Sequence, residues 1–244
     1  MNRMDAYFKT DIGRKRAVNQ DYVFGSREAV GELPNLFIVA DGMGGHNAGE
    51  FASEFCVKTF VKKVETSSER TVIGRIESAI SETNQLLREK AAEDENLSGM
   101  GTTFVACTVC DNVAYAANIG DSRLYLIDDG VISQITVDHS LVEEMVRNGE
   151  IDRQEARFHP NKNVITRALG VTKNVIPDFF EIAVKSGSVL LLCSDGLSNM
   201  VEDEEIKRVV AAHEDDIQGA VEELIEQANS NGGRDNIAIV IVRM

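Results

Sequence analysis

The chain has 244 residues, of which 43% are hydrophobic and 27% charged, and its formal net charge is −15. These values are typical of a soluble globular protein with one large domain or two small ones, and the acidic balance argues against a nucleic-acid or anionic-membrane surface. The sequence contains neither a signal-peptide pattern nor an apolar run long enough to span a bilayer. We therefore expect a cytoplasmic protein that binds neither nucleic acid nor membrane and, by default, a monomer.

Apolar runs rich in β-branched residues predict ten strands along the chain. They cover residues 6–10, 22–25, 36–40, 103–110, 113–118, 123–127, 131–135, 179–183, 189–193 and 237–242. Short turns at Asp111-Asn112 and Asp128-Asp-Gly130 join neighbouring strands and are hairpin signals. The sheets are therefore expected to be mainly antiparallel.

Helical periodicity indicates two long helices, at residues 48–64 and 73–87, between the early strands and the central β block. Two more helices are predicted near the end of the chain, at residues 203–212 and 217–228. The expected layout is an α+β protein with helices on the outside of two sheets.

The stretch from residue 140 to 170 differs in character from the rest. Ser140 and Asp152 each precede a glutamate by three residues, which is the N-terminal capping pattern of a helix. Asn148-Gly149 and Pro160 are typical helix ends. We expect two short polar helices that form a flap over the domain rather than part of its core.

Cys107 and Cys110 form a C-x-x-C pair inside a predicted strand. Residues three apart on a strand point to opposite faces, so the pair is not placed for zinc binding or redox chemistry. All four cysteines are predicted to be isolated, reduced core thiols.

Four aspartates stand beside glycine, asparagine or serine at turns, and three of them directly follow an apolar run. They are Asp41, Asp121, Asp195 and Asp235. Each is expected at a strand end or a tight turn. If the four converge, two like charges ~4 Å apart cost about 4 kcal/mol at an effective dielectric near 20, so a cation must lie between them. For ligands that are all oxygen, the natural cation is Mg²⁺ or Mn²⁺.

The segment Asp41-Gly-Met-Gly-Gly-His46 follows a predicted strand and precedes a helix. Taken alone, it is compatible with a metal site, with a plain glycine turn, or with a dinucleotide-binding phosphate loop. The nucleotide interpretation fits poorly, because Asn47 stands where the third glycine belongs and Asp41 would repel a pyrophosphate. It would make the chain an oxidoreductase and would leave the other aspartates unexplained.

Arg14, Lys15 and Arg16 lead into Asp21 in an otherwise acidic chain. This run is either a solvated basic turn or a phosphate-binding element. An arginine beside metal-binding carboxylates suits a phosphate ester, because its guanidinium grips two phosphate oxygens while metal ions hold the others.

In order and spacing, six motifs resemble those of bacterial metal-dependent, type 2C serine/threonine protein phosphatases. They are Arg16-x-x-Asn-Gln-Asp21, Asp41-Gly-Met-Gly-Gly, Gly99-Met-Gly-Thr-Thr103, Asn118-Ile-Gly-Asp-Ser-Arg123, Ser194-Asp-Gly-Leu197 and Arg234-Asp-Asn236. The resemblance implies one phosphatase domain over residues 1–244, folded as an α-β-β-α sandwich with a flap at about 140–170. It also implies hydrolysis of phosphoserine and phosphothreonine in proteins, with a serine/threonine kinase and its substrates as partners.

The resemblance further implies the roles of individual residues. Asp41 would bridge two Mn²⁺ or Mg²⁺ ions, with the Gly42 carbonyl, Asp195 and Asp235 as further ligands. Asp21 would support the waters of these ions. Asp121 would hold a third, weaker ion together with Asp195, and Arg16 would bind the phosphate.

The chain departs from the family pattern at two positions. Gln20 replaces a glutamate that many members carry, and Met43 occupies the position of a histidine proposed as general acid in eukaryotic members. His46 is therefore a candidate proton donor, although a surface histidine ahead of a helix explains it equally well. A catalytically silent phosphoprotein-binding module is the remaining alternative, which the retained aspartates disfavour.

Overall fold

The computed structural model describes residues 4–45 and 48–244. Its helices are α1 (Ala48–Glu65), α2 (Val72–Glu93), a short 3-10 helix (Glu95–Leu97), α3 (Leu141–Arg147), α4 (Arg153–Phe158), α5 (Asp195–Ser198), α6 (Asp203–Ala212) and α7 (Ile217–Ser230). Its strands are β1 (Asp5–Asp11), β2 (Asp21–Ser26), β3 (Leu36–Met43), β4 (Gly101–Thr102), β5 (Phe104–Cys110), β6 (Val113–Ile119), β7 (Arg123–Asp128), β8 (Val131–Gln134), β9 (Asp178–Ala183), β10 (Val189–Cys193) and β11 (Ile237–Arg243).

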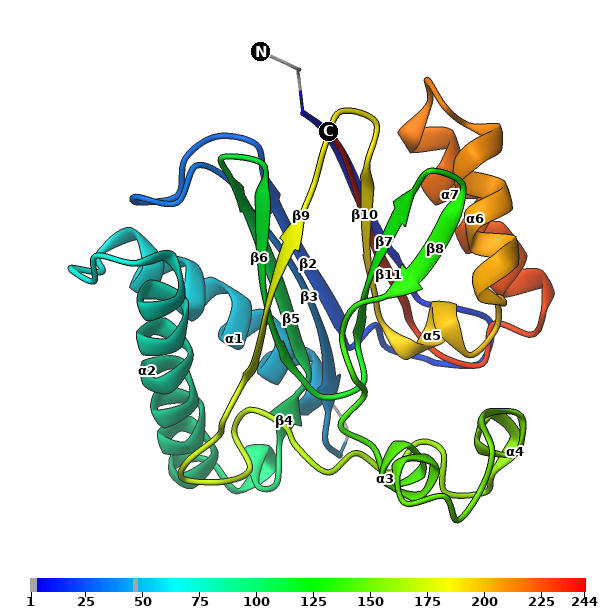
Figure 1. Cartoon of the computed structure of the whole chain (residues 1–244). Coiled ribbons are helices and arrows are strands. Elements are labelled where there is room, and N and C mark those ends of the chain that lie inside the picture. The colour runs from blue at the N-terminus through cyan, green and yellow to red at the C-terminus, as the bar shows by residue number, and fades with distance from the viewer. Residues whose placement is uncertain (1–3, 46–47) are drawn as a thin grey trace.

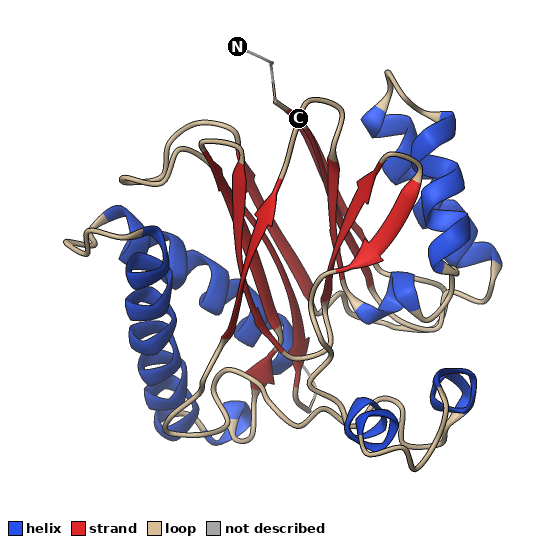
Figure 2. Ribbon diagram, in the orientation of Figure 1, coloured by secondary structure: helices blue, strands red, loops and turns tan. Residues whose placement is uncertain are grey.

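The strands form two antiparallel sheets that pack face to face between helical layers (Figures 1 and 2). One sheet has the order β1-β11-β10-β7-β8. The other has the order β2-β3-β5-β6-β9, with β4 paired to β3. Helices α1 and α2 cover the second sheet, and α6 and α7 cover the first (Figure 1). The predicted α-β-β-α sandwich is therefore confirmed.

Alternation of side chains along the strands accounts for the layers, because successive side chains of a strand point to opposite faces. On β3, Phe37 and Val39 enter the core between the sheets, whereas Leu36, Ile38 and Ala40 pack against α1 and α2. Strand β11 divides in the same way, with Val240 between the sheets and Ile239 facing α7. Strands buried on both faces explain why the sequence shows continuous apolar runs there.

The structure differs from the predicted elements near the aspartates. Strand β3 continues through Asp41 and Gly42 to Met43, so Asp41 lies within a strand and not at its end. The reason is pairing, since Asp21 lies opposite Asp41 on β2, and Gly42 lies opposite Thr102 on β4. The sequence analysis also missed β4 and α5, which are too short to show a period.

Between residues 140 and 170 the chain forms α3 and α4, which lie beyond the sheets in Figure 1. Asp152 and Glu155 form the predicted reciprocal capping box. Ser140 caps α3, but the Glu143 side chain pairs with Arg153 instead of completing a box. The flap role of this stretch, and the assignment of the chain to one domain, stay predictions.

All four cysteines have free thiols. Cys107 lies in the core between the sheets, but Cys110 is only half-buried at the end of β5, so the prediction of a core thiol is wrong for that residue. None of the described helices combines the length and apolar character that crossing a bilayer requires.

Candidate active site

Five aspartates from distant parts of the chain face a common space at one end of the two sheets. They are Asp21, Asp41, Asp121, Asp195 and Asp235. Burial raises the pKa of Asp41 well above its usual value, and Asp21 and Asp195 are the next largest causes. Asp21 and Asp195 shift in the same direction, mainly because each is buried. The structure thus brings together all of the aspartates that the sequence singled out.

Asp21 is tied to the segment that contains Asp195. The Ser194 hydroxyl donates to Asp21 Oδ2 at 2.6 Å and accepts the Ala238 N–H at 2.9 Å. One hydroxyl therefore joins β2, β10 and β11 across the two sheets. The other oxygen of Asp21, Oδ1, is buried without a hydrogen-bond partner in the described structure.

Two threonines hold the backbone of Asp41. The Asp41 N–H donates to Thr103 Oγ1, and the Asp41 carbonyl accepts from Thr102 Oγ1 and from the Thr103 N–H, each at 2.9 Å. Thr103 Oγ1 also lies 2.7 Å from Ser122 Oγ, next to Asp121. These contacts explain why the glycine-threonine motif at residues 99–103 accompanies the aspartate motifs: it positions Asp41 relative to Asp121.

Gly42 permits close backbone packing beside Asp41. Its N–H donates to the Gln20 carbonyl at 2.9 Å, and a Cβ at this position would overlap the carbonyl oxygen of Gly49 at the start of α1. Gly49 is equally constrained, since its own Cβ would lie 2.7 Å from the Gly42 oxygen. Gly42 and Gly49 are therefore required by the close contact between their backbones.

We expect Gly42→Ala to lower the free energy of unfolding by about 2–4 kcal/mol, because the overlap is with backbone that cannot rotate away. Gly45→Ala is the matched control, since no heavy atom lies within 4 Å of a Cβ there. Urea unfolding monitored by circular dichroism measures both variants. Equal stabilities of the two would contradict the packing argument.

Arg16 reaches the cluster through Asp235. Its Nη2 donates to Asp235 Oδ2 at 2.7 Å, and the two residues are 219 positions apart. This contact is the main reason that the pKa of Arg16 is raised, and Asp41 and Asp195 add to it. Asn236 fixes the loop that carries Arg16: its Nδ2 donates to the Ile12 and Val18 carbonyls at 2.9 and 3.0 Å.

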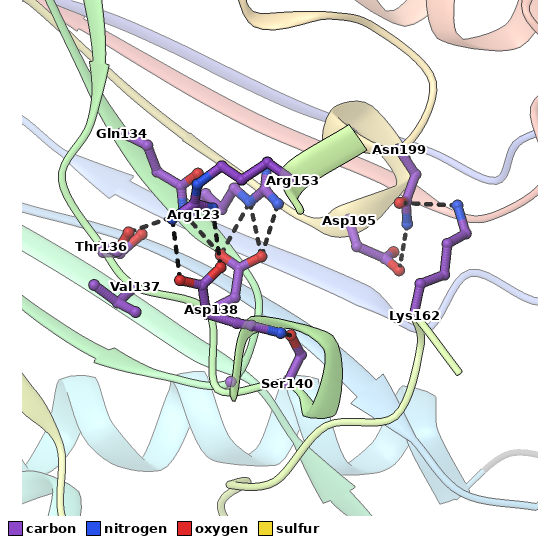
Figure 3. A network of polar contacts seen from close by, with 12 residues as sticks. Arg123, Gln134, Thr136, Val137, Asp138, Ser140, Arg153, Lys162, Asp195 and Asn199 are labelled. Atoms are coloured by element: carbon purple, nitrogen blue, oxygen red, sulfur yellow. Dashed lines mark hydrogen bonds and ion pairs between the residues drawn. The ribbon is translucent and has the colours of Figure 1, made fainter. Parts of the chain in front are cut away.

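Two successive hydrogen bonds connect Asp195 to Lys162 in the 140–170 stretch (Figure 3). Lys162 Nζ donates to Asn199 Oδ1 at 3.1 Å, and Asn199 Nδ2 donates to Asp195 Oδ2 at 2.9 Å. Asp195 Oδ1 is buried and has no hydrogen-bond partner in the described structure. The contact chain therefore fixes one carboxylate oxygen and leaves the other available to a ligand.

Asp121 lines a groove of about 800 Å³ that is bordered by β7 and β8, by helices α3 and α4, and by α5 with the start of α6. Burial raises the pKa of Asp121 well above its usual value, and Asp195 and Asp138 add to the rise. Arg123 opposes it, but this guanidinium is already paired with Asp138, with Nη2 and Oδ2 2.7 Å apart (Figure 3). The negative charges of Asp121 and Asp195 in this groove are therefore only partly offset by positive groups.

The cluster fits a divalent cation on the chemistry of its donors. Two buried carboxylate oxygens, Asp21 Oδ1 and Asp195 Oδ1, have no described partner, and such groups are costly unless a ligand satisfies them. All the converging side chains offer oxygen, which Mg²⁺ and Mn²⁺ prefer. Across residues 4–45 and 48–244, however, no three His, Cys, Asp or Glu side chains are placed so that they could hold a metal ion. The ligand roles of single residues therefore remain predictions.

The structure rules out the dinucleotide-binding interpretation of the glycine segment. Such a unit needs a strand, a helix and a second strand parallel to the first. Here β3 pairs with both β2 and β5 in antiparallel orientation. His46, the candidate proton donor, lies outside the described residues, and its role stays a prediction.

Residues 12–238 match the family model described as protein phosphatase 2C. The chain belongs to the protein phosphatase 2C family. It is 40% identical to the serine/threonine phosphatase stp of Listeria innocua, in an alignment that covers 98% of this chain and 95% of that protein. As a member of this family, the chain is a protein serine/threonine phosphatase, as the six motifs predicted.

Solved structures of bacterial 2C-type phosphatases share the fold throughout. The serine/threonine phosphatase of S. agalactiae matches with a TM-score of 0.92 at 33% identity, covering 99% of this chain and 100% of that one. The catalytic domain of the phosphatase PstP, in complex with two manganese ions, matches with a TM-score of 0.85 at 33% identity, with coverages of 98% and 97%. The 2C-type family is metal-dependent.

The sequence analysis gave no role to several residues that support the phosphatase site. Ser194 and Asn236 stood inside quoted motifs, so the motifs themselves were the signal. Asn199 follows Asp195 by four residues, a helical spacing that becomes visible only once α5 is known to begin at Asp195. No pattern in the sequence indicated a role for Lys162.

Proposed function

We propose that this phosphatase hydrolyses phosphoserine and phosphothreonine with two Mn²⁺ or Mg²⁺ ions held mainly by Asp41, Asp195, Asp235 and the Gly42 carbonyl. The observation that carries the proposal is the convergence of five aspartates in which two buried carboxylate oxygens have no described partner. When bound, such ions lower the pKa of water toward ~7 and so supply hydroxide for attack on phosphorus at neutral pH. Asp121, with Asp195, would hold a third, weaker ion.

The protein's own residues prepare the cluster for this chemistry. Thr102 and Thr103 fix the backbone of Asp41, so the strand that presents its carboxylate is in place before substrate arrives. Asp21, held by Ser194, would accept hydrogen bonds from the waters of the bound ions. Arg16 already points into the cluster and would exchange Asp235 for two oxygens of the phosphate.

The leaving serine or threonine oxygen must gain a proton. Met43 cannot supply it, because a thioether carries no acidic proton. Water in the cluster is one donor, and His46 is the candidate side chain. The three buried cysteines take no part, because burial raises the pKa values of Cys56, Cys107 and Cys193 and keeps these thiols protonated.

The biological substrates proposed for this chain are phosphoproteins made by a partner serine/threonine kinase, including that kinase. The support is kinship with bacterial phosphatases such as stp, which is an analogy and not a contact in the structure.

A phosphothreonine peptide tests the proposed function directly. We expect release of inorganic phosphate when Mn²⁺ is present and none after treatment with a chelator, with recovery on adding Mn²⁺ back. The circular dichroism spectrum of the chelated protein controls for unfolding. A folded protein without metal-dependent turnover would favour the silent module.

Asn199 is a positioning residue for Asp195 and can be tested separately. We expect Asn199→Ala to weaken Mn²⁺ binding about tenfold, because hydrogen bonds that orient metal-binding carboxylates are worth ten- to a hundredfold in affinity. Asn231→Ala is the control, since the Asn231 side chain donates to a backbone carbonyl of this region, that of Met200, at 2.8 Å. Isothermal titration calorimetry with Mn²⁺ measures both. Unchanged affinity in Asn199→Ala would remove Asn199 from the metal site.

A further inference from the structure

An apolar cavity of about 430 Å³ opens directly beside the proposed metal cluster and takes no part in the mechanism above. Its apolar lining consists of Met43, Ile165, Ala168, Val171, Val175 and Ile176. Met43 belongs to β3, two residues beyond Asp41, so the cavity begins on the strand that carries the central aspartate. The remaining lining comes from the segment between α4 and β9, which passes β4 and the lower end of α2 in Figure 1.

The cavity is built into the fold. Gly101 lies opposite Met43 on β4, and a Cβ there would lie 2.6 Å from Met43 Cε and 2.9 Å from Val171 Cγ2. The missing side chain of Gly101 therefore allows Met43 and Val171 to meet across it. A side chain at this position would fill the space where the two lining residues approach each other.

The segment that forms the far wall is fixed at several points. The buried Asn84 of α2 donates to the Thr172 carbonyl at 3.0 Å and accepts the Gly170 N–H at 2.8 Å. Leu169 and Thr102 exchange two backbone hydrogen bonds, at 2.9 and 3.1 Å. The wall is thus held before any ligand arrives, which lowers the entropy cost of binding.

The cavity wall and its surroundings expose apolar side chains on an acidic protein. Val171 is 54% exposed and Ile176 is 73% exposed, and Val164, which precedes the lining residue Ile165, is 46% exposed. Of the lining residues, Arg167 and Asp178 neutralise each other at 2.8 Å, and the buried His139 also contacts Asp178 at 3.0 Å. A charged ligand side chain would therefore gain no partner here, whereas an apolar one would be removed from water.

We propose that this cavity binds an apolar side chain of the phosphoprotein substrate and so sets sequence preference around the phosphorylated residue. The proposal rests on the proposed function, because it takes the phosphate to lie at the Asp41 cluster. A strand rises ~3.3 Å per residue, which places Met43 about 7 Å along β3 from Asp41. An extended substrate has the same rise, so the apolar residue lies two to four positions from the phosphorylated one. The space fits a leucine, methionine or phenylalanine side chain.

A peptide series tests the proposal. The parent is a phosphothreonine peptide with alanine at every flanking position, and each variant carries one leucine two, three or four positions to either side. We expect leucine at one of these positions to raise kcat/KM about tenfold through KM, since burial of a few methylenes in an apolar pocket gives discrimination of this order. Equal kcat/KM for all peptides would overturn the proposal.

A variant of the cavity lining tests whether the leucine preference arises in this cavity. The double variant Val171→Ser/Ile176→Ser changes only exposed side chains, so folding is not threatened, and Val131→Ser on β8, where the valine is 59% exposed, is the matched control. The double variant should reduce the leucine preference below twofold and leave hydrolysis of p-nitrophenyl phosphate, which has no flanking residue, unchanged. The control should retain the preference. A preference that survives in the double variant would overturn the assignment.

Two measurements distinguish this proposal from failure of the proposed function and from occupation of the cavity by a second copy of the chain. If the wild-type protein with Mn²⁺ fails to hydrolyse p-nitrophenyl phosphate, the proposed function fails, whereas hydrolysis without peptide preference overturns the cavity proposal alone. Light scattering tests whether a second copy of the chain covers the cavity. A wild-type dimer that the double variant converts to a monomer, with peptide rates unchanged, would overturn the substrate assignment.

Discussion

Asp41→Asn is expected to reduce kcat on a phosphothreonine peptide by at least ~10³-fold while raising the melting temperature of the metal-free protein. The loss follows from the proposed bridging role of Asp41, because an amide holds divalent ions weakly and both ions depend on this side chain. The rise in melting temperature follows from the buried position of Asp41, where in the metal-free protein no cation offsets its charge. Burial and the surrounding carboxylates raise the pKa of Asp41, so removing its charge relieves repulsion. Relief of about 1 kcal/mol would raise the melting temperature of a protein of this size by roughly 2–4 °C.

The prediction is specific because the two effects go in opposite directions: kcat falls while the melting temperature rises. A variant that merely damages the fold would lower both kcat and the melting temperature. Asp129→Asn in the turn between β7 and β8 is the control, since Asp129 is 78% exposed and pairs with the surface residue Lys185. It should change neither quantity. Full activity in Asp41→Asn would remove Asp41 from the centre of the mechanism.

Arg16→Ala is expected to lower kcat/KM about 10²-fold and to leave Mn²⁺ affinity unchanged or slightly improved. Loss of a preorganised donor to the transition state typically costs 10²–10³-fold. The metal site should not suffer, because Arg16 now occupies Asp235 Oδ2, at 2.7 Å, an oxygen that a metal ion would otherwise use. Phosphate-release kinetics and a Mn²⁺ titration of the same sample measure the two effects.

Two further variants refine the Arg16 prediction. Arg16→Lys should recover only part of the activity, because an ammonium cannot present the two parallel N–H groups of a guanidinium. Lys15→Ala removes a neighbouring positive charge and should have little effect if the specific contact matters. A Lys15→Ala loss as large as that of Arg16→Ala would indicate general electrostatic attraction instead of phosphate binding.

The architecture was predictable because it depends on repeated local patterns. Continuous apolar runs predicted β3, β5, β10 and β11, and helical stripes predicted α1, α2, α6 and α7. Two packed antiparallel sheets with helices outside then follow from burying every apolar face. The six motifs added the family, which composition alone could not supply.

The support of the site was not predictable, because it consists of single contacts between distant polar residues. Ser194 reaches Asp21 over 173 positions, and Thr103 reaches Ser122 across β5 and β6. Such hydrogen bonds leave no periodic trace in a sequence. The position of Asp41 inside β3 was missed for a related reason, since it depends on pairing with Asp21 and with the two-residue strand β4. The order of the motifs therefore identifies the reaction, whereas the three-dimensional structure is needed to show which contacts hold the site residues in place.

A calorimetric titration of the metal-free protein with Mn²⁺, run in parallel on Asp41→Asn, tests most directly whether the converging aspartates form a metal centre. The proposed ligand set predicts two tightly bound ions in the wild-type protein, a third weaker one that depends on Asp121, and loss of the tight pair in Asp41→Asn. A folded wild-type protein that takes up no Mn²⁺, or an Asp41→Asn titration that superimposes on the wild-type curve, would contradict the account.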